Sequence, residues 1–325
     1  MTGGVLRVVR SWPGRDATAL AWSADGRRFA SAQHRDITVT TAAKDADPTA
    51  DPAQPSDDDT RVTTPGPVLS LAFGSAGDVL LAAPFTIEWP SGSLVQDLTP
   101  ALTDGLPSPA VRGFGLDAAA FTPDGRAALL SGQYRPPRGL PSQPGWSGPT
   151  KRVILTDGDS ATLLWSEGVG RFVLACADSV AAFADTTVRI VRRTPPGTEP
   201  RPQTLGGHDT AVRALAFGPG GKLLAAGFAD GNVVVWSLSS GLESARWQAH
   251  DTDVLTLDWA GDRLVTGGSD GSVRLFDADG GALAGTDPQS GRPVVALAAH
   301  PEGHAVLAAL RGTAADVVEL DLTAS

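Results

Sequence analysis

Cysteine and long hydrophobic segments are what this sequence has least of. Its single cysteine, Cys176, excludes a disulfide within the chain and a zinc site built from several thiolates. No apolar stretch reaches the roughly 18 residues that a membrane-spanning helix needs. The first ten residues also lack the apolar run of a secretory signal. We therefore expect a cytoplasmic protein with no membrane-inserted segment.

Positive charge is scarce as well. Lysine occurs only at Lys44, Lys151 and Lys222, and the formal net charge is −10. A nucleic-acid-binding surface needs clustered lysine and arginine to contact phosphates, so the sequence predicts no nucleic-acid partner. The preference for arginine over lysine, together with abundant alanine and glycine, indicates a GC-rich genome. We accordingly expect a bacterial source, of actinobacterial type.

Motifs for catalysis or metal binding are also missing. The sequence has no HExxH, CxxC, EF-hand or GxSxG pattern, and none of its glycine pairs precedes a predicted helix. His300 and His304 flank a Pro-Glu-Gly turn, which we expect not to point both imidazoles at one ion. Residues 57–59 are aspartates without the glycine and glutamate of a calcium loop. Cys176 lies in the apolar run FVLACA and is expected in the core. The sequence therefore predicts no enzyme, no cofactor and no metal.

What the sequence does have is many turn-forming residues and an internal repeat. It contains 38 glycines and 25 prolines, which is typical of many short strands joined by turns. Residues 207–236 and 249–277 repeat one pattern, in which His208 aligns with His250 and Asp230 with Asp270. Each copy has two apolar strands and an Asp-Gly turn that leads into a third strand. A period of about 40 residues with this pattern indicates one four-stranded blade.

These two copies resemble the WD-repeat β-propeller family. The resemblance implies an all-β fold, a seven-bladed propeller of four-stranded antiparallel blades, forming a single domain over residues 1–325. Degenerate copies supply the other blades, at residues 16–40, 67–98, 116–165, 170–205 and 290–322. Six blades would result if residues 170–205 were an insertion. The last copy offers three strands, and residues 5–12 resemble the fourth strand at 242–249. We therefore predict that the N-terminal strand closes the last blade.

The resemblance also implies a polar network that stabilises each blade. One blade carries His208, Asp230 and Trp236, although Ala226 stands where the family has a hydroxyl residue. The next blade carries its own version, with Phe276 in place of the N–H-donating tryptophan: His250, Thr266 and Asp270. Buried polar groups must be satisfied together, so we expect a structural role for both sets.

Two segments interrupt the repeats. Residues 44–60 hold six aspartates and one lysine, and we predict an acidic, disordered loop between the third and fourth strands of the first blade. Residues 133–150 hold five prolines and join the second and third strands of the third blade. Tyr134 and Trp146 in this insertion could contact a partner or pack against the propeller itself.

The position at the start of each first strand is predicted to face the same side as the proline-rich loop. The predicted partner-binding residues are Thr18, Leu69, Asp117, Tyr134, Trp146, Arg213 and Leu255. The resemblance implies a non-catalytic scaffold or adaptor that binds protein or peptide partners on its faces, within a larger assembly. The alternatives are a propeller enzyme, such as a lactonase-like hydrolase, and a small-molecule or glycan binder that uses Trp146 and Tyr134.

Overall fold

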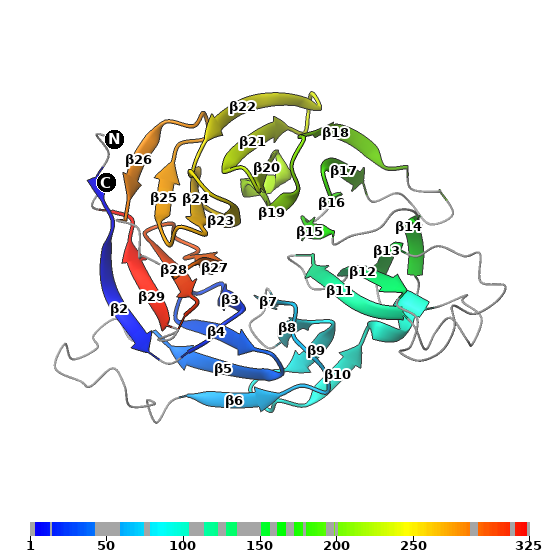
Figure 1. Cartoon of the computed structure of the whole chain (residues 1–325). Coiled ribbons are helices and arrows are strands. Elements are labelled where there is room, and N and C mark those ends of the chain that lie inside the picture. Colours follow the sequence, from blue (N-terminus) through cyan, green and yellow to red (C-terminus); the bar gives the residue numbers. More distant parts are fainter. Residues whose placement is uncertain are drawn as a thin grey trace.

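Seven antiparallel sheets stand around a central axis, as Figure 1 shows from one end of that axis. The structure is a computed structural model, and it describes residues 4–13, 15–42, 59–74, 79–103, 114–122, 128–134, 151–156, 161–166, 172–177, 180–192, 198, 201–286, 292–312 and 316–323. Residues 170–205, the most degenerate copy, contribute a complete blade, so the alternative of six blades is wrong. No helix among the described residues is long and apolar enough to cross a membrane.

Blades 1 to 6 each have four strands in sequence order, and we number the seven blades along the chain. Blades 1 and 2 are β3 (Ala19–Trp22), β4 (Arg28–Gln33), β5 (Asp36–Thr41), β6 (Thr60–Thr63), and β7 (Ser70–Phe73), β8 (Val79–Ala83), β9 (Phe85–Glu88), β10 (Leu94–Asp97). Blades 3 and 4 are β11 (Phe114–Phe121), β12 (Ala128–Tyr134), β13 (Lys151–Thr156), β14 (Ala161–Trp165), and β15 (Val173–Cys176), β16 (Val180–Ala184), β17 (Thr187–Arg192), β18 (Gln203–Gly207). Blades 5 and 6 are β19 (Val212–Phe217), β20 (Leu223–Phe228), β21 (Asn232–Ser237), β22 (Leu242–Gln248), and β23 (Val254–Ala260), β24 (Arg263–Gly268), β25 (Val273–Phe276), β26 (Ala282–Gly285). Two short 3-10 helices, η1 (Thr99–Thr103) and η2 (Pro219–Gly221), lie between strands.

Blade 7 closes the ring with both ends of the chain. It contains β27 (Val294–Ala299), β28 (Ala305–Leu310), β29 (Asp316–Asp321) and the N-terminal β2 (Arg7–Pro13), and β2 pairs antiparallel with β29. The predicted N-terminal closing strand is thus confirmed. The short β1 (Gly4–Val5) goes further, because it pairs in parallel with β26 of blade 6. The N-terminal segment therefore bridges two blades, and Figure 1 shows β2 as the outermost strand of blade 7, beside β29.

The core is divided among the seams between blades. Among the described residues, each of the seven buried hydrophobic clusters joins residues of two neighbouring blades. In β21, Val234 and Trp236 pack toward blade 4, whereas Val233 and Val235 pack toward blade 6. Successive side chains of a strand point to opposite faces, and here both faces are covered. This explains why the middle strands are continuous apolar runs rather than alternating ones.

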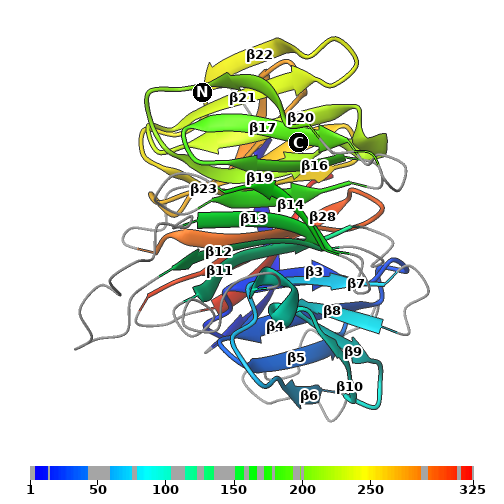
Figure 2. The ribbon, with the colours of Figure 1, turned by 90° about the vertical axis from the view of Figure 1, so that its right-hand side faces the viewer.

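The antiparallel order gives the ring two distinct faces. We call the face at which the innermost strands begin the start face; the turns between second and third strands also lie there. The opposite face is the end face, where first strands turn into second strands. Figure 2 shows the disc from the side. Residues 43–58 connect β5 to β6 and residues 135–150 connect β12 to β13, so both predicted loops lie largely outside the described residues.

The C-terminal end of the acidic segment is an exception to the predicted disorder. The side chain of Asp59 is only 4% exposed. Its carboxylate accepts hydrogen bonds from the Arg15 guanidinium at 2.6 Å and from the Thr40 hydroxyl at 2.8 Å. Asp59 is therefore part of the packed blade and not of a solvated acidic run.

Candidate functional site

One residue near the start of the innermost strand is displaced from the ladder in several blades. In β11, β19 and β23 the register shifts by one residue, and the extra residue is Asp117, Arg213 or Leu255. Thr18 and Leu69 donate their backbone N–H to the second strand at the equivalent place. Such a bulge redirects a side chain out of the regular alternation. The structure thus gathers five of the predicted partner-binding positions along the start face.

These five side chains differ in their exposure to solvent. Thr18 and Arg213 are exposed, whereas Leu69 and Leu255 are half-buried. The Arg213 Nε lies 3.0 Å from the Asp253 Oδ2 in the segment that leads into blade 6. Both side chains of this pair are substantially exposed, so the pair contributes about 0–1 kcal/mol. A partner carboxylate could therefore replace Asp253 at little cost.

Asp117 lies in a different environment from the other four. Its side chain is 7% exposed, and its Oδ2 accepts a hydrogen bond of 2.6 Å from the fully buried Lys151 Nζ. The ammonium group also lies 5.0 Å from the centre of the Phe172 ring. The structure therefore uses Asp117 to neutralise a buried cation between blades 3 and 4, and its contact with a partner stays a prediction.

The two aromatic residues of the proline-rich insertion are the least defined part of the predicted site. Tyr134 is the last residue of β12, where its backbone pairs with Phe114. The Tyr134 side chain and all of Trp146 lie outside the described residues. Their predicted partner contact stays a prediction.

The polar network of blade 6 is buried and continuous. His250 is 0% exposed, and its Nε2 lies 2.8 Å from the Thr266 hydroxyl. Its Nδ1 lies 3.1 Å from the Ser272 hydroxyl and 3.4 Å from the Asp270 Oδ1. Burial alone would raise the pKa of Asp270, but hydrogen bonds from His250 and Ser272 hold that pKa well below its usual range. The structure brings the three predicted residues of this blade together.

Blade 5 carries a shorter and more exposed version. The His208 Nδ1 lies 3.4 Å from the Asp230 Oδ2, and these side chains are 18% and 27% exposed. Ala226 leaves the imidazole without the hydroxyl partner that blade 6 supplies. The third predicted member, Trp236, is buried in the seam toward blade 4. The Thr210 hydroxyl lies 3.3 Å from the His208 Nδ1, so this set is a smaller and more exposed network than that of blade 6.

Sequence reasoning missed one partner in each network. Ser272 and Asn232 follow the Asp-Gly turns by one residue and donate their backbone N–H and side-chain groups to Asp270 and Asp230. The signal was present in the sequence, because the third residue of an Asp-Gly-Ser or Asp-Gly-Asn turn is placed to donate back to the aspartate.

A cavity of about 560 Å³ opens among the innermost strands of blades 4, 5 and 6. Its lining residues are mostly aliphatic residues and glycines, although the surface that they expose is more polar than apolar, and they include two titratable side chains, Cys176 and Asp258. Burial raises the pKa of the Cys176 thiol to about 12. Burial also raises the pKa of Asp258, although its carboxylate accepts the backbone N–H of Trp259 and of Ala299, each at 2.8 Å. Asp258 therefore ties blade 6 to blade 7.

The turn between β27 and β28 differs from its sequence-based description. The rings of His300 and His304 lie 4.0 Å apart, centre to centre. Ligand atoms of these two residues and of Glu302 all lie within 4.8 Å of one another. The two imidazoles therefore lie closer together than we expected from the sequence, and the expectation that they do not point at one ion stays a prediction.

Comparisons with known proteins agree with the repeats. The family profile described as "WD domain, G-beta repeat" matches residues 200–237 and 242–277, which is less than a quarter of the chain. Each match runs from the outer strand of one blade through the first three strands of the next. The match is therefore confined to blades 5 and 6, with the outer strand of blade 4, in a seven-bladed propeller.

Curated relatives match only part of this chain. ASTRA-associated protein 1 of the fungus Verticillium alfalfae is 44% identical over 86 residues, which is 26% of this chain and 21% of that protein. The chromatin assembly factor 1 subunit FAS2 homolog of Oryza sativa subsp. japonica is 34% identical over 88 residues, or 25% and 17% of the two chains. The F-box-like/WD repeat-containing protein TBL1X of Mus musculus is 33% identical over 121 residues, or 32% and 23%. These relatives are eukaryotic, so the bacterial source stays a prediction, and the chain spans about a fifth of their length.

Proposed function

We propose that this WD40-repeat propeller is a non-catalytic scaffold that binds a protein or peptide partner on its start face. One observation supports the proposal: the innermost strands of blades 3, 5 and 6 each carry a bulged residue near their start-face end. The neighbouring residues of these strands are mostly small and apolar, as in VRALAF and VLTLDW, because they fill the seams. The bulged residue is not limited in this way, and it is Asp117 in blade 3, Arg213 in blade 5 and Leu255 in blade 6.

The scaffold beneath these positions suits recognition of a partner. Seven clusters of buried side chains hold the blades together, and the N-terminal strands close the ring. Binding to a preformed surface loses less conformational entropy than binding to a mobile one. Arg213 and Thr18 offer polar contacts, and Leu69 and Leu255 offer apolar area, which is the mixture found in protein interfaces.

A charge reversal on each face tests the proposal. We would immobilise the full chain as wild type, as Arg213→Glu on the start face, and as Arg27→Glu in the end-face turn of blade 1. Arg27 is exposed, so both variants make the same change of charge at a surface site. Proteins captured from the native cell extract would be quantified by mass spectrometry, after thermal unfolding has verified that all three proteins are folded.

The expected result is a stoichiometric partner that Arg213→Glu loses and Arg27→Glu retains. Loss on Arg27→Glu alone would assign binding to the end face. Capture of no stoichiometric partner by the wild type would contradict the scaffold function itself. A parallel deletion within residues 135–150 would show whether the proline-rich segment takes part.

The cavity beside Asp258 favours one second candidate, the binding of a small molecule. Its volume of about 560 Å³ is within the range of ligand pockets, and one carboxyl group lies in its lining. A thermal-shift screen of metabolites on the full chain tests this candidate. A compound that stabilises the wild type and no longer stabilises Asp258→Asn would support it, and an absence of such compounds would count against it.

A further inference from the structure

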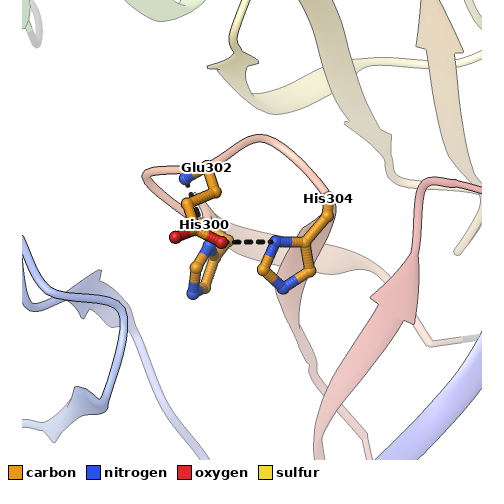
Figure 3. A group of neighbouring side chains, drawn as sticks. All are labelled: His300, Glu302 and His304. Carbon is orange, nitrogen blue, oxygen red and sulfur yellow. Dashed lines mark hydrogen bonds and ion pairs between the residues drawn. The ribbon is translucent and has the colours of Figure 1, made fainter.

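The turn from His300 to His304 is a tight connection that folds its side chains onto one side. The His300 N–H donates to the Ala305 carbonyl at 2.9 Å, and the Gly303 N–H donates to the His300 carbonyl at 2.8 Å. Gly303 has a φ of +73°, which glycine adopts without strain. Figure 3 shows the result: Glu302 extends its carboxylate toward the Nδ1 of His304 and lies beside the ring of His300.

His300 is held in a fixed orientation by its surroundings. It is 8% exposed, its ring meets the Trp22 ring edge-on at 4.8 Å, and its Nε2 lies 3.2 Å from the Gly26 carbonyl. The carbonyl can only accept, so the Nε2 carries the proton and the Nδ1 keeps its lone pair. That lone pair accepts a long hydrogen bond of 3.2 Å from the Glu302 N–H. Metal-binding histidines commonly donate their second N–H to a backbone carbonyl in this way.

The other two side chains are free to adjust. Glu302 and His304 have side chains that are 74% and 45% exposed, and the Glu302 Oε2 lies 3.6 Å from the His304 Nδ1. Ligand atoms around a tetrahedral zinc ion, at about 2.0–2.2 Å from the metal, stand roughly 3.3–3.5 Å from one another. The three ligand atoms already lie within 4.8 Å, so movements of about 1 Å by the exposed side chains would complete this spacing.

Carboxylates surround the turn. Glu319 and Asp321 on the neighbouring β29 both interact electrostatically with His304. The Leu322 N–H donates to the His304 carbonyl at 2.8 Å, which fixes this side of the turn against the end of β29. Arg10 lies 3.8 Å from Glu319, between Nε and Oε2, and offsets one of the negative charges. The carboxylates of Asp321 and Glu302 add negative charge beside the turn, and this charge favours the binding of a cation.

We propose that His300, Glu302 and His304 bind one divalent transition-metal ion on the end face, with Zn²⁺ as the best-suited ion. Two imidazole nitrogens and one carboxylate oxygen form a donor set that Zn²⁺ accepts, whereas Ca²⁺ and Mg²⁺ prefer oxygen alone. The ion takes the His300 Nδ1 lone pair in place of the Glu302 N–H. Three protein ligands leave at least one coordination position, which water fills in the isolated chain.

Zinc titration of the full chain tests this site. The protein would be prepared without a polyhistidine tag, stripped with a chelator and titrated with ZnCl₂ by calorimetry, as wild type, His304→Ala and Glu302→Gln. Both variants change exposed side chains, so the fold is expected to survive. His34→Asn is the matched control, because His34 is exposed on the start face and its φ of +55° is one that asparagine tolerates.

We expect one zinc ion per wild-type chain and per His34→Asn chain, and a loss of affinity of about tenfold or more in each ligand variant. Titration with Co²⁺ should give the visible absorption of a low-coordinate ion with histidine ligands in the wild type, and His304→Ala should abolish it. A wild-type chain that takes up no zinc would overturn the proposal. Equal affinity in all four proteins would also overturn it, because the ion would then lie elsewhere.

Discussion

The imidazole of His250 lies 2.8 Å from the hydroxyl of Thr266, and this contact ties the segment before β23 to the second strand of blade 6. The other nitrogen of the same ring meets Ser272 and Asp270 in the turn between the second and third strands. One buried side chain therefore connects three parts of the blade. In blade 5, Ala226 takes the place of the hydroxyl, and His208 is partly exposed.

This difference predicts unequal costs for two identical substitutions. His250→Ala leaves the buried Thr266 hydroxyl without its imidazole partner and removes the imidazole from Ser272 and Asp270, so we expect a loss of about 2–4 kcal/mol in the free energy of unfolding. His208→Ala removes a partly exposed contact and should cost about 1 kcal/mol or less. Urea denaturation of both variants measures this, and equal losses would contradict the proposed difference between the networks.

Asp270 predicts a dependence of stability on acid pH. Its pKa in the folded chain lies below the value of 3.8 that an unperturbed aspartate has, so the unfolded chain binds the proton more readily. The stabilisation is therefore present above about pH 4 and decreases as the pH falls below that value. Asp270→Asn should reduce the acid slope of the unfolding free energy, measured by urea denaturation between roughly pH 3 and pH 7. Asp209→Asn, at an exposed position before blade 5, is the matched control for the removal of one carboxylate.

The repeats made much of this fold predictable. Apolar runs joined by Asp-Gly turns place the strands of blades 5 and 6, because that turn chemistry and the continuous burial act locally. The closing strand could be predicted because residues 5–12 carry the same alternation as the outer strand at 242–249. The parallel pairing of β1 with β26 could not, since two residues carry no pattern of their own.

The polar sites were predictable only where their members lie in one repeat. His250, Thr266 and Asp270 recur at fixed spacing, so their meeting follows from the repeat. Lys151 and Asp117 meet across 34 positions and a bulge, which no local pattern indicates. The rings of His300 and His304 lie close together because their side chains extend to the same side of the turn. The sequence of a turn does not by itself specify these side-chain directions.

The buried pair of Lys151 and Asp117 predicts a large loss of stability on removal of the lysine, which a second substitution at the aspartate should partly restore. Lys151→Met leaves a nearly buried carboxylate without its cation, and such a loss costs about 3–5 kcal/mol. Adding Asp117→Leu removes the orphaned charge and should restore much of the stability, because apolar replacements of buried pairs are often tolerated. A double-mutant cycle by urea denaturation measures this, and a double variant no more stable than Lys151→Met would contradict the argument.

Truncation at the N-terminus separates the two roles of the N-terminal segment. Removing residues 1–5 deletes only β1, whose two-residue pairing with β26 is short, so we expect a small loss of stability and a monodisperse chain. Removing residues 1–13 also deletes β2 and leaves the whole of β29 as an open edge, which favours pairing with other chains. It further removes Trp12, whose ring lies 4.7 Å from Phe29 in the seam between blades 7 and 1. We therefore expect the longer truncation to unfold at clearly lower urea concentration and to form larger species in size-exclusion chromatography with light scattering. Equal behaviour of the two truncated chains would show that β2 does not close the ring in solution.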